Sequence, residues 1–146
     1  MKQTVRPMEE SDIEKLTELE EKIFSVPWKK AAFRALLTSP LSVCVVAQAG
    51  DRVVGCASMT VLSGEGDIDK VMVEEAFRGQ HLAEKMLDSL LETGAQRGVT
   101  AYTLEVRTSN EPAIALYRKK GFEGVGVRPR FYEKPAEDAL IMWKRQ

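Results

Sequence analysis

Glu105 and Tyr117 are two residues whose side chains could transfer protons, given their chemistry and their positions in the sequence. Glu105 lies in an alternating stretch, residues 100–108, and occupies the polar face of the strand that this alternation predicts. A carboxylate on that face could take a proton from a bound group, directly or through water. Tyr117 follows on a predicted helix, spaced so that its hydroxyl could reach back over the strand end. The same pattern also fits a solvated strand glutamate and a core tyrosine.

The segment Arg78-Gly79-Gln80-His81-Leu82-Ala83 could bind a phosphate group. It follows a strand-like stretch, Val71-Met72-Val73, and opens a long helical pattern. The first turn of a helix leaves backbone N–H groups unpaired and adds a partial positive charge, which suits a pyrophosphate. Gly79 lets a ligand approach the backbone, and Arg78 could add a charge-assisted contact. The glycine spacing matches neither a Walker phosphate loop nor a dinucleotide fingerprint, so by itself the segment also fits an ordinary connection.

Two helices and three strands are predicted for the first half of the chain. Helical spacing predicts a first helix that ends before Pro27, with a buried face formed by Ile13, Leu16, Leu19 and Ile23. A second short helix, ended by Pro40, is predicted to carry on one side Trp28, Ala32, Phe33, Leu36 and Leu37. Stretches rich in β-branched residues, separated by turn residues, predict antiparallel strands over residues 41–49, 52–62 and 67–73.

The second half predicts a long helix, a strand, a short helix and two final strands. The long helix ends near Arg97-Gly98 and has a buried face formed by Leu82, Met86, Leu87, Leu90 and Leu91. After it come a strand over 100–108, a helix over 111–120 and strands over 122–128 and 137–144. The order ααβββαβαββ predicts an α/β fold with a mixed sheet. Its N-terminal part is antiparallel, and its central pair is parallel where the long helix crosses over.

Composition excludes several classes of function. Hydrophobic residues make up 44% of the 146 residues and charged residues 29%, as in ordinary globular proteins. A formal net charge of -1 argues against binding nucleic acid, and no apolar run is long enough to span a membrane. The first residues lack the apolar core of a signal peptide. Cys44 and Cys56 have no metal-ligand spacing and are expected to be buried reduced thiols, so a cytoplasmic protein is predicted.

A longer motif carries a family resemblance. Residues 104–122 read Leu-Glu-Val-Arg-x-Ser-Asn-x-x-Ala-Ile-x-Leu-Tyr-x-x-x-Gly-Phe when the variable positions between Arg107 and Gly121 are left open. Together with Phe24-Ser25-x-Pro27-Trp28 and the tail after Arg128, this run resembles the GCN5-related N-acetyltransferase (GNAT) superfamily. Within it, the sequence is most similar to the RimI-like ribosomal-protein alanine N-acetyltransferases. The resemblance covers residues 1–146 and implies a single N-acetyltransferase domain with the GNAT-like sheet.

The resemblance implies that Glu105 is a general base and Tyr117 a general acid. A protein α-amine has a pKa near 8 and attacks a thioester only as the free amine, so a base must take its proton. Acetyl-CoA is implied as co-substrate, without a metal. The implied cofactor-binding residues are Val71, Met72, Val73, Arg78, Gly79, Gln80, His81, Leu82, Ala83, Glu84 and Asn110.

Two of these residues, His81 and Asn110, also allow another interpretation. His81 departs from the family pattern, because a glycine is usual where it stands. As the chain's one histidine it could be catalytic, although a solvent-facing loop residue fits as well. Asn110 could also serve simply as a helix N-cap.

The acceptor implied by the resemblance is the N-terminal peptide of a small-subunit ribosomal protein, most specifically its N-terminal alanine. Trp28, Phe131 and Tyr132 are the expected walls of the peptide groove, and acidic clusters around Asp67 and Glu137 would suit a basic tail. Two alternatives remain: an acetyltransferase for a small-molecule amine, and a catalytically silent acetyl-CoA-binding module. No nucleic-acid or membrane partner is expected, and the sequence carries no sign of an oligomeric state.

Overall fold

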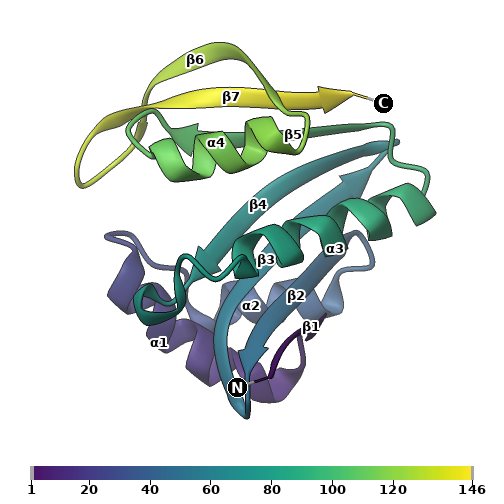
Figure 1. Cartoon of the computed structure of the whole chain (residues 1–146), viewed down its shortest axis with the longest axis vertical. Helices are drawn as coiled ribbons and strands as arrows, with labels where there is room; N and C mark the ends of the chain where they lie inside the picture. Colours follow the sequence, from purple (N-terminus) through teal and green to yellow (C-terminus); the bar gives the residue numbers. More distant parts are fainter. Residues whose placement is uncertain (1, 146) are drawn as a thin grey trace.

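A computed structural model describes residues 2–145 of the chain, as a mixed sheet with helices on both faces (Figure 1). The strands run in the spatial order β1-β2-β3-β4-β5-β7-β6. In chain order the elements are β1 (Gln3–Pro7), a 3-10 turn (Glu10–Asp12), α1 (Ile13–Ile23), α2 (Lys30–Thr38), β2 (Ser42–Ala49), β3 (Arg52–Leu62), β4 (Glu65–Val73), a second 3-10 turn (Glu75–Phe77), α3 (Leu82–Gln96), β5 (Ala101–Arg107), α4 (Glu111–Lys119), β6 (Glu123–Tyr132) and β7 (Glu137–Arg145).

The predicted order of elements is confirmed from α1 onward, but one strand was missed. β1 pairs antiparallel with β2, in a register that sets Gln3 opposite Ala49 and Pro7 opposite Val45. This strand has a single β-branched apolar residue, Val5, and no alternating pattern around it. Its pairing with the longer β2 therefore determines its conformation, and local sequence preference does not.

The second helix is shorter at its start than predicted, because Trp28 lies in the preceding loop. α2 begins at Lys30, and the residue before it is extended. The backbone N–H of Trp28 donates to the Glu20 carboxylate at 2.9 Å, so a side chain of α1 holds this residue outside the helix. Its ring still packs on the helix, 5.5 Å from the ring of Phe33.

The sheet divides between β4 and β5, the parallel pair that the crossover predicts. Their pairing is confined to Glu65 with Ala101, Gly66 with Tyr102 and Asp67 with Thr103. Gly66 is required there, because a Cβ atom would lie 2.8 Å from the Tyr102 ring. Beyond these pairs the two strands diverge, as Figure 1 shows, while β5 continues antiparallel to β7.

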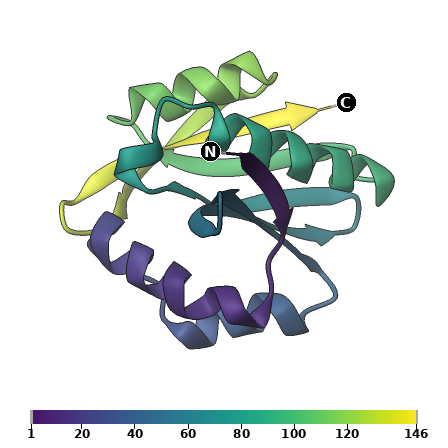
Figure 2. The ribbon, with the colours of Figure 1, turned by 60° about the horizontal axis from the view of Figure 1, so that its bottom comes forward.

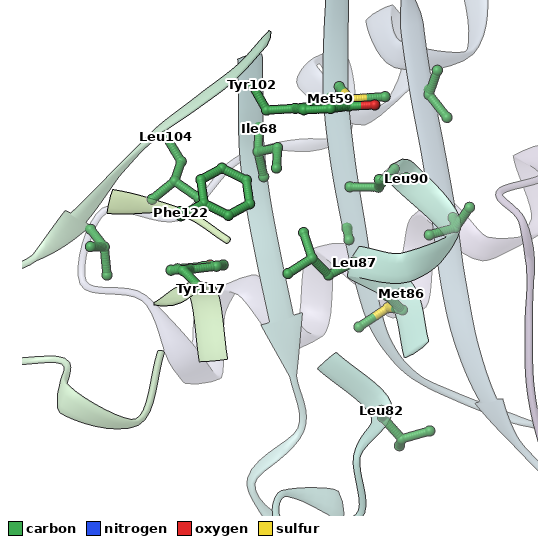
Figure 3. Close-up of a cluster of buried hydrophobic side chains, with 14 of the residues drawn as sticks. Met59, Ile68, Leu82, Met86, Leu87, Leu90, Tyr102, Leu104, Tyr117 and Phe122 are labelled. Atoms are coloured by element: carbon green, nitrogen blue, oxygen red, sulfur yellow. The ribbon is translucent and has the colours of Figure 1, made fainter. Parts of the chain in front are cut away.

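Helices cover the sheet on both faces (Figure 2). α1 and α2 pack on one face, where a cluster of buried side chains includes Leu16, Leu19 and Phe33. α3 and α4 lie on the other face. The larger cluster on that side contains Met86, Leu87, Leu90, Tyr102, Tyr117 and Phe122 (Figure 3). These two cores fix the diverging strands from opposite sides.

The two cysteines lie on the α1 side of the sheet. Both are free thiols, with Cys56 buried as expected and Cys44 only partly so. Burial raises the pKa of Cys44 to about 12, which keeps this thiol protonated. Within residues 2–145, no helix is long and apolar enough to cross a membrane.

Candidate active site

A cavity of about 830 Å³ opens where β4 and β5 diverge. Its lining comes from the segment after α1, from β4 and β5, from α4 and the residues just before it, and from the end of β6 with the β6–β7 connection (residues 133–136). The expected site residues found in this lining are Trp28, Val71, Glu105, Asn110, Tyr117, Phe131 and Tyr132. The divergence of the strands therefore brings together residues that are far apart in the sequence.

A β-bulge at Asp69 shapes the β4 wall. Ile68 pairs with Met59 and Lys70 pairs with Ser58, so Asp69 has no residue opposite it on β3. The extra residue turns Ile68 toward the α3 core and Lys70 toward α1, although they would otherwise share a face. On the other edge, no β5 residue pairs with β4 from Ile68 onward. Alternating hydrophobicity alone cannot reveal such a bulge.

Glu105 lies half-buried in the middle of β5, opposite Ile141 of β7. Burial raises the pKa of its carboxyl group, the nearby Asp67 carboxylate raises it further, and Arg128 opposes the shift. On the β4 side, burial is also the main cause that raises the pKa of Asp69 to about 6. Glu105 is thus a stronger base than a solvated glutamate and has access to the cavity.

Tyr117 projects from α4 into the core that borders the cavity (Figure 3). It is 7% exposed, and its ring packs edge-on against Phe122 at 5.8 Å. Burial raises the pKa of its hydroxyl to about 12, with a smaller contribution from Tyr132. The phenol therefore stays protonated at neutral pH and is able to donate a hydrogen bond or a proton.

Asn110 is the N-cap of α4, as one of the two readings of this residue predicts. Its Oδ1 accepts a hydrogen bond from the backbone N–H of Ala113 at 3.3 Å. The residue also lines the cavity, so the capping role leaves it at the site. Its cap starts the helix that carries Tyr117.

The turn before α3 has the geometry of an anion-binding backbone. Gly79 and His81 have left-handed φ angles of 78° and 65°. The backbone N–H groups of residues 81–84 have no hydrogen-bond acceptor within residues 2–145, and His81 provides no side-chain cap. Because a Cβ atom at Gly79 would meet nothing within 4 Å, the backbone is open to a ligand. These features fit a bound pyrophosphate.

Several side chains predicted to bind the cofactor are engaged elsewhere. Glu84 pairs with Lys119 and Lys120 of α4 at 3.1 and 2.7 Å, and the hydrogen bonds from these lysines lower its pKa to about 2. The Gln80 side chain accepts a hydrogen bond from Gln3, and Arg78 Nε donates to the Val73 carbonyl at 3.1 Å. These residues can serve the cofactor mainly through their backbone.

The strand before this turn divides its side chains between the two faces of the sheet. Met72 is buried in the α1-side cluster, and its backbone faces β3, because it lies opposite Cys56 in the same register that bonds the Glu74 N–H to the Val54 carbonyl. Val71 lines the cavity, while Val73 packs against the α3-side core. Within the turn, Leu82 is a buried core residue and Ala83 is partly buried. His81 is exposed, like the three residues before it, with 75% of its side chain accessible.

The predicted aromatic walls meet around the cavity. Phe131 and Tyr132 come from the end of β6, with ring centroids 5.0 Å apart in an edge-on arrangement. Trp28 lies in the loop after α1 and also lines the cavity. Aromatic surfaces on two loops therefore border the space into which Glu105 faces.

Sequence reasoning missed a buried ion pair beside Trp28. Lys70 Nζ donates to Glu20 Oε1 at 2.9 Å, and their side chains are 8% and 0% exposed. The ammonium group also lies 4.0 Å from the Phe24 ring centroid and 4.2 Å from that of Trp28. A signal for this pair was present, since Glu20 falls in the helical apolar stripe one turn after Leu16.

Sequence reasoning also missed the role of Arg107, at the end of β5, which binds the β6–β7 connection. Its guanidinium group donates to two backbone carbonyls of that connection and to Glu137. Alternation placed Arg107 on the polar face of its strand but did not indicate what it contacts. Its partners are brought near it by the return of the chain from β6 to β7.

Known proteins resemble the chain over nearly its whole length. The model of the Acetyltransferase (GNAT) family matches residues 13–122. The N-alpha-acetyltransferase RimI of Mycobacterium tuberculosis is 36% identical over 145 residues, which cover 95% of this chain and 90% of that protein. The ribosomal protein bS18-alanine N-acetyltransferase of Haemophilus ducreyi is 32% identical over 140 residues, covering 91% of this chain and 93% of that protein.

A solved structure has the same architecture. The crystal structure of the ribosomal-protein-S18-alanine N-acetyltransferase from Escherichia coli matches with a TM-score of 0.90 and 26% sequence identity. The match covers 99% of this chain and 94% of that chain. The splayed sheet is therefore shared with a solved acetyltransferase.

Proposed function

The chain belongs to the acetyltransferase (GNAT) family, and we propose that it acetylates the α-amine at the N-terminus of a protein. It is an acetyl-CoA-dependent N-acetyltransferase. The acceptor best supported is the N-terminal alanine of a small-subunit ribosomal protein, because relatives of 32% and 28% identity are named for that reaction on bS18. We expect the enzyme to work in the cytoplasm, where ribosomal proteins are made.

The observation that carries this proposal is that Glu105 and Tyr117 line one cavity together with Val71 of β4, while the open turn before α3 follows the end of β4 in the chain. Acetyl-CoA, when bound, supplies an acetyl group activated as a thioester. The unpaired backbone N–H groups of residues 81–84 are suited to hold its pyrophosphate. The unpaired edge of β4 after Asp67 offers backbone donors for the thioester end.

Glu105 is proposed to take the proton that the acceptor amine must lose. The raised pKa of its carboxyl group brings it closer to that of an α-amine, near 8, than a solvated glutamate would be. A base close in pKa to its partner transfers protons efficiently. Asp67 and Asp69 add negative charge nearby, which favours an acceptor that arrives as a cation.

Tyr117 is proposed to donate to the departing sulfur. Its hydroxyl is protonated at neutral pH because burial raises its pKa to about 12. A donor held on a capped helix is already oriented when the thiolate forms, so little reorganisation is needed during the reaction. Tyr117 would thus act on the departing sulfur, and Glu105 on the acceptor amine.

The test is an acetylation assay on acceptors that differ in one amine. A peptide that begins with alanine is compared with the same peptide blocked at its α-amine but carrying a lysine, and with a free polyamine. We expect mass spectrometry to find one acetyl group, on the α-amine of the unblocked peptide. Acetylation of the blocked peptide or of the polyamine at a comparable rate would instead support a lysine or small-amine acetyltransferase.

A further inference from the structure

Arg107 donates hydrogen bonds to the connection between β6 and β7, which forms one wall of the cavity. Nη2 donates to the Glu133 carbonyl at 3.0 Å. Nη1 donates to the Pro135 carbonyl at 3.0 Å and to Glu137 Oε1 at 3.2 Å. The same guanidinium group lies 4.5 Å from the centroid of the Tyr132 ring. One side chain of β5 thus contacts four successive parts of this wall.

The wall formed by the end of β6 and the β6–β7 connection needs such an anchor because its backbone is strained. Arg130 and Lys134 have φ angles of 51° and 49°, in the left-handed region that side chains other than glycine rarely adopt. Such a conformation is unfavourable and persists where surrounding contacts over-determine it. The carbonyls that Arg107 binds belong to Glu133 and Pro135, on either side of Lys134.

The connection also meets the loop after α1 at the same point. Ser25 Oγ donates to the Glu133 carbonyl at 3.5 Å, so this carbonyl joins β5, the β6–β7 connection and the loop that carries Trp28. Arg107 therefore fixes the position of the wall that carries Tyr132. It also fixes the point at which the β6–β7 connection meets the loop after α1.

Glu137 links Arg107 to the residues just before α4. Its carboxylate accepts hydrogen bonds from the Ser109 backbone N–H at 2.7 Å and from Thr108 Oγ1 at 3.2 Å. These bonds, with that of Arg107, lower its pKa to about 2, so Glu137 stays ionised across the working pH range. The anchor is thus independent of the proton transfers proposed for Glu105.

We propose that Arg107 is a positioning residue that holds the β6–β7 connection in place and thereby sets the affinity for the acceptor. The acceptor affinity rests on the proposed function, whereas the anchoring of the connection does not. Arg107 has no proposed contact with the reacting atoms, and its guanidinium group acts through Tyr132 and the backbone of residues 133–135. Loss of the guanidinium group should therefore raise KM for the peptide far more than it lowers kcat.

The experiment compares Arg107→Ala with a matched control, Arg145→Ala. Arg145 also stacks on an aromatic ring, Trp143, at 4.5 Å, but at the far end of β7. We expect Arg107→Ala to raise KM for the alanine peptide about tenfold or more, since three charge-assisted hydrogen bonds to the wall are lost. KM for acetyl-CoA should stay within about twofold, and Arg145→Ala should behave as wild type.

Two further measurements separate positioning from a general loss of structure. Added guanidinium ion should restore part of the peptide affinity of Arg107→Ala, and Arg107→Lys should restore less because it lacks the planar fork. Amide hydrogen exchange should quicken across residues 130–136 in Arg107→Ala but not in Arg145→Ala. This exchange readout needs no activity, so it tests the anchor even if wild-type protein fails to acetylate peptides.

Two results would overturn the proposal. One is an unchanged peptide KM in an Arg107→Ala variant of an enzyme that acetylates the peptide. The other is unchanged amide exchange across the connection. Absence of acetylation by the wild-type protein, together with faster exchange in Arg107→Ala, would instead refute the proposed function and leave the anchor standing.

Discussion

The turn before α3 and the cavity between β4 and β5 are built in opposite ways. The turn presents backbone N–H groups, and its Glu84 and Arg78 side chains are engaged with α4 and with the end of β4. The cavity presents side chains from several segments, held by ion pairs such as Lys70 with Glu20.

This difference explains why the turn can depart from its family pattern. A surface made of backbone depends on φ angles and tolerates different side chains, as long as they point outward. His81 satisfies this condition, since its side chain is 75% exposed while its backbone takes the left-handed conformation that a glycine would adopt. A surface made of side chains depends on every partner, so substitutions in the cavity should have larger effects.

The largest effect on stability is expected from breaking the buried pair in the cavity wall with Lys70→Met. The substitution keeps side-chain volume but leaves the Glu20 carboxyl group at 0% exposure without its cation. We expect the free energy of unfolding to fall by about 3–5 kcal/mol. Urea denaturation measures this loss. A Glu20→Gln/Lys70→Met double variant should recover most of it, and equal losses in the two variants would show that charge burial is not the cause.

A smaller effect, on rate alone, is expected for Tyr117→Phe. Removal of a general acid slows turnover about 100-fold, whereas the ring and its packing on Phe122 remain. Tyr102→Phe is the matched control, because it also removes a core hydroxyl, one that donates to the Leu91 carbonyl at 3.0 Å. Steady-state kinetics should find Tyr102→Phe near wild type, with a stability loss of about 1 kcal/mol. Wild-type turnover in Tyr117→Phe would remove this residue from the mechanism.

The smallest effect is expected in the turn, from His81→Gly. Glycine adopts a φ of 65° without the cost that histidine bears, so the protein should gain about 1 kcal/mol in thermal unfolding. Acetyl-CoA should bind equally well or more tightly in calorimetry. Gly79→Ala tests the same idea in reverse, since its φ is 78° and a Cβ atom there would meet nothing. A large loss of acetyl-CoA affinity in His81→Gly would show that the imidazole contacts the cofactor.

Local patterns predicted the elements of this site, and long-range pairing determined the rest. Alternation identified the polar face on which Glu105 lies, and the Asn110 cap together with helical spacing identified the helix of Tyr117. The bulge at Asp69 arises in the pairing of β4 with the neighbouring β3, and the strand β1 arises from pairing with β2 beyond two helices; alternation encodes neither. The partners of Arg107 depend likewise on how the chain returns from β6 to β7.

The family motif was needed to give these residues roles. An alternating glutamate and a helical tyrosine occur in many folds, and periodicity cannot distinguish a base from a solvated carboxylate. The fold adds the reason why Glu105 suits the role, since its half-buried position beside Asp67 raises its pKa. Burial of this kind depends on tertiary structure and is not visible in the strand's own sequence.

The pH dependence of acetyl transfer in wild type and in Glu105→Gln tests most directly whether Glu105 is the base. Because burial raises the pKa of Glu105, wild-type kcat/KM should fall as pH drops through that raised value, where the carboxylate becomes protonated. Glu105→Gln should lose about 100- to 10,000-fold in rate, and its remaining activity should rise only as the α-amine deprotonates near pH 8. Acetyl-CoA affinity should not change. A variant that keeps wild-type turnover and the same pH profile would contradict the assignment.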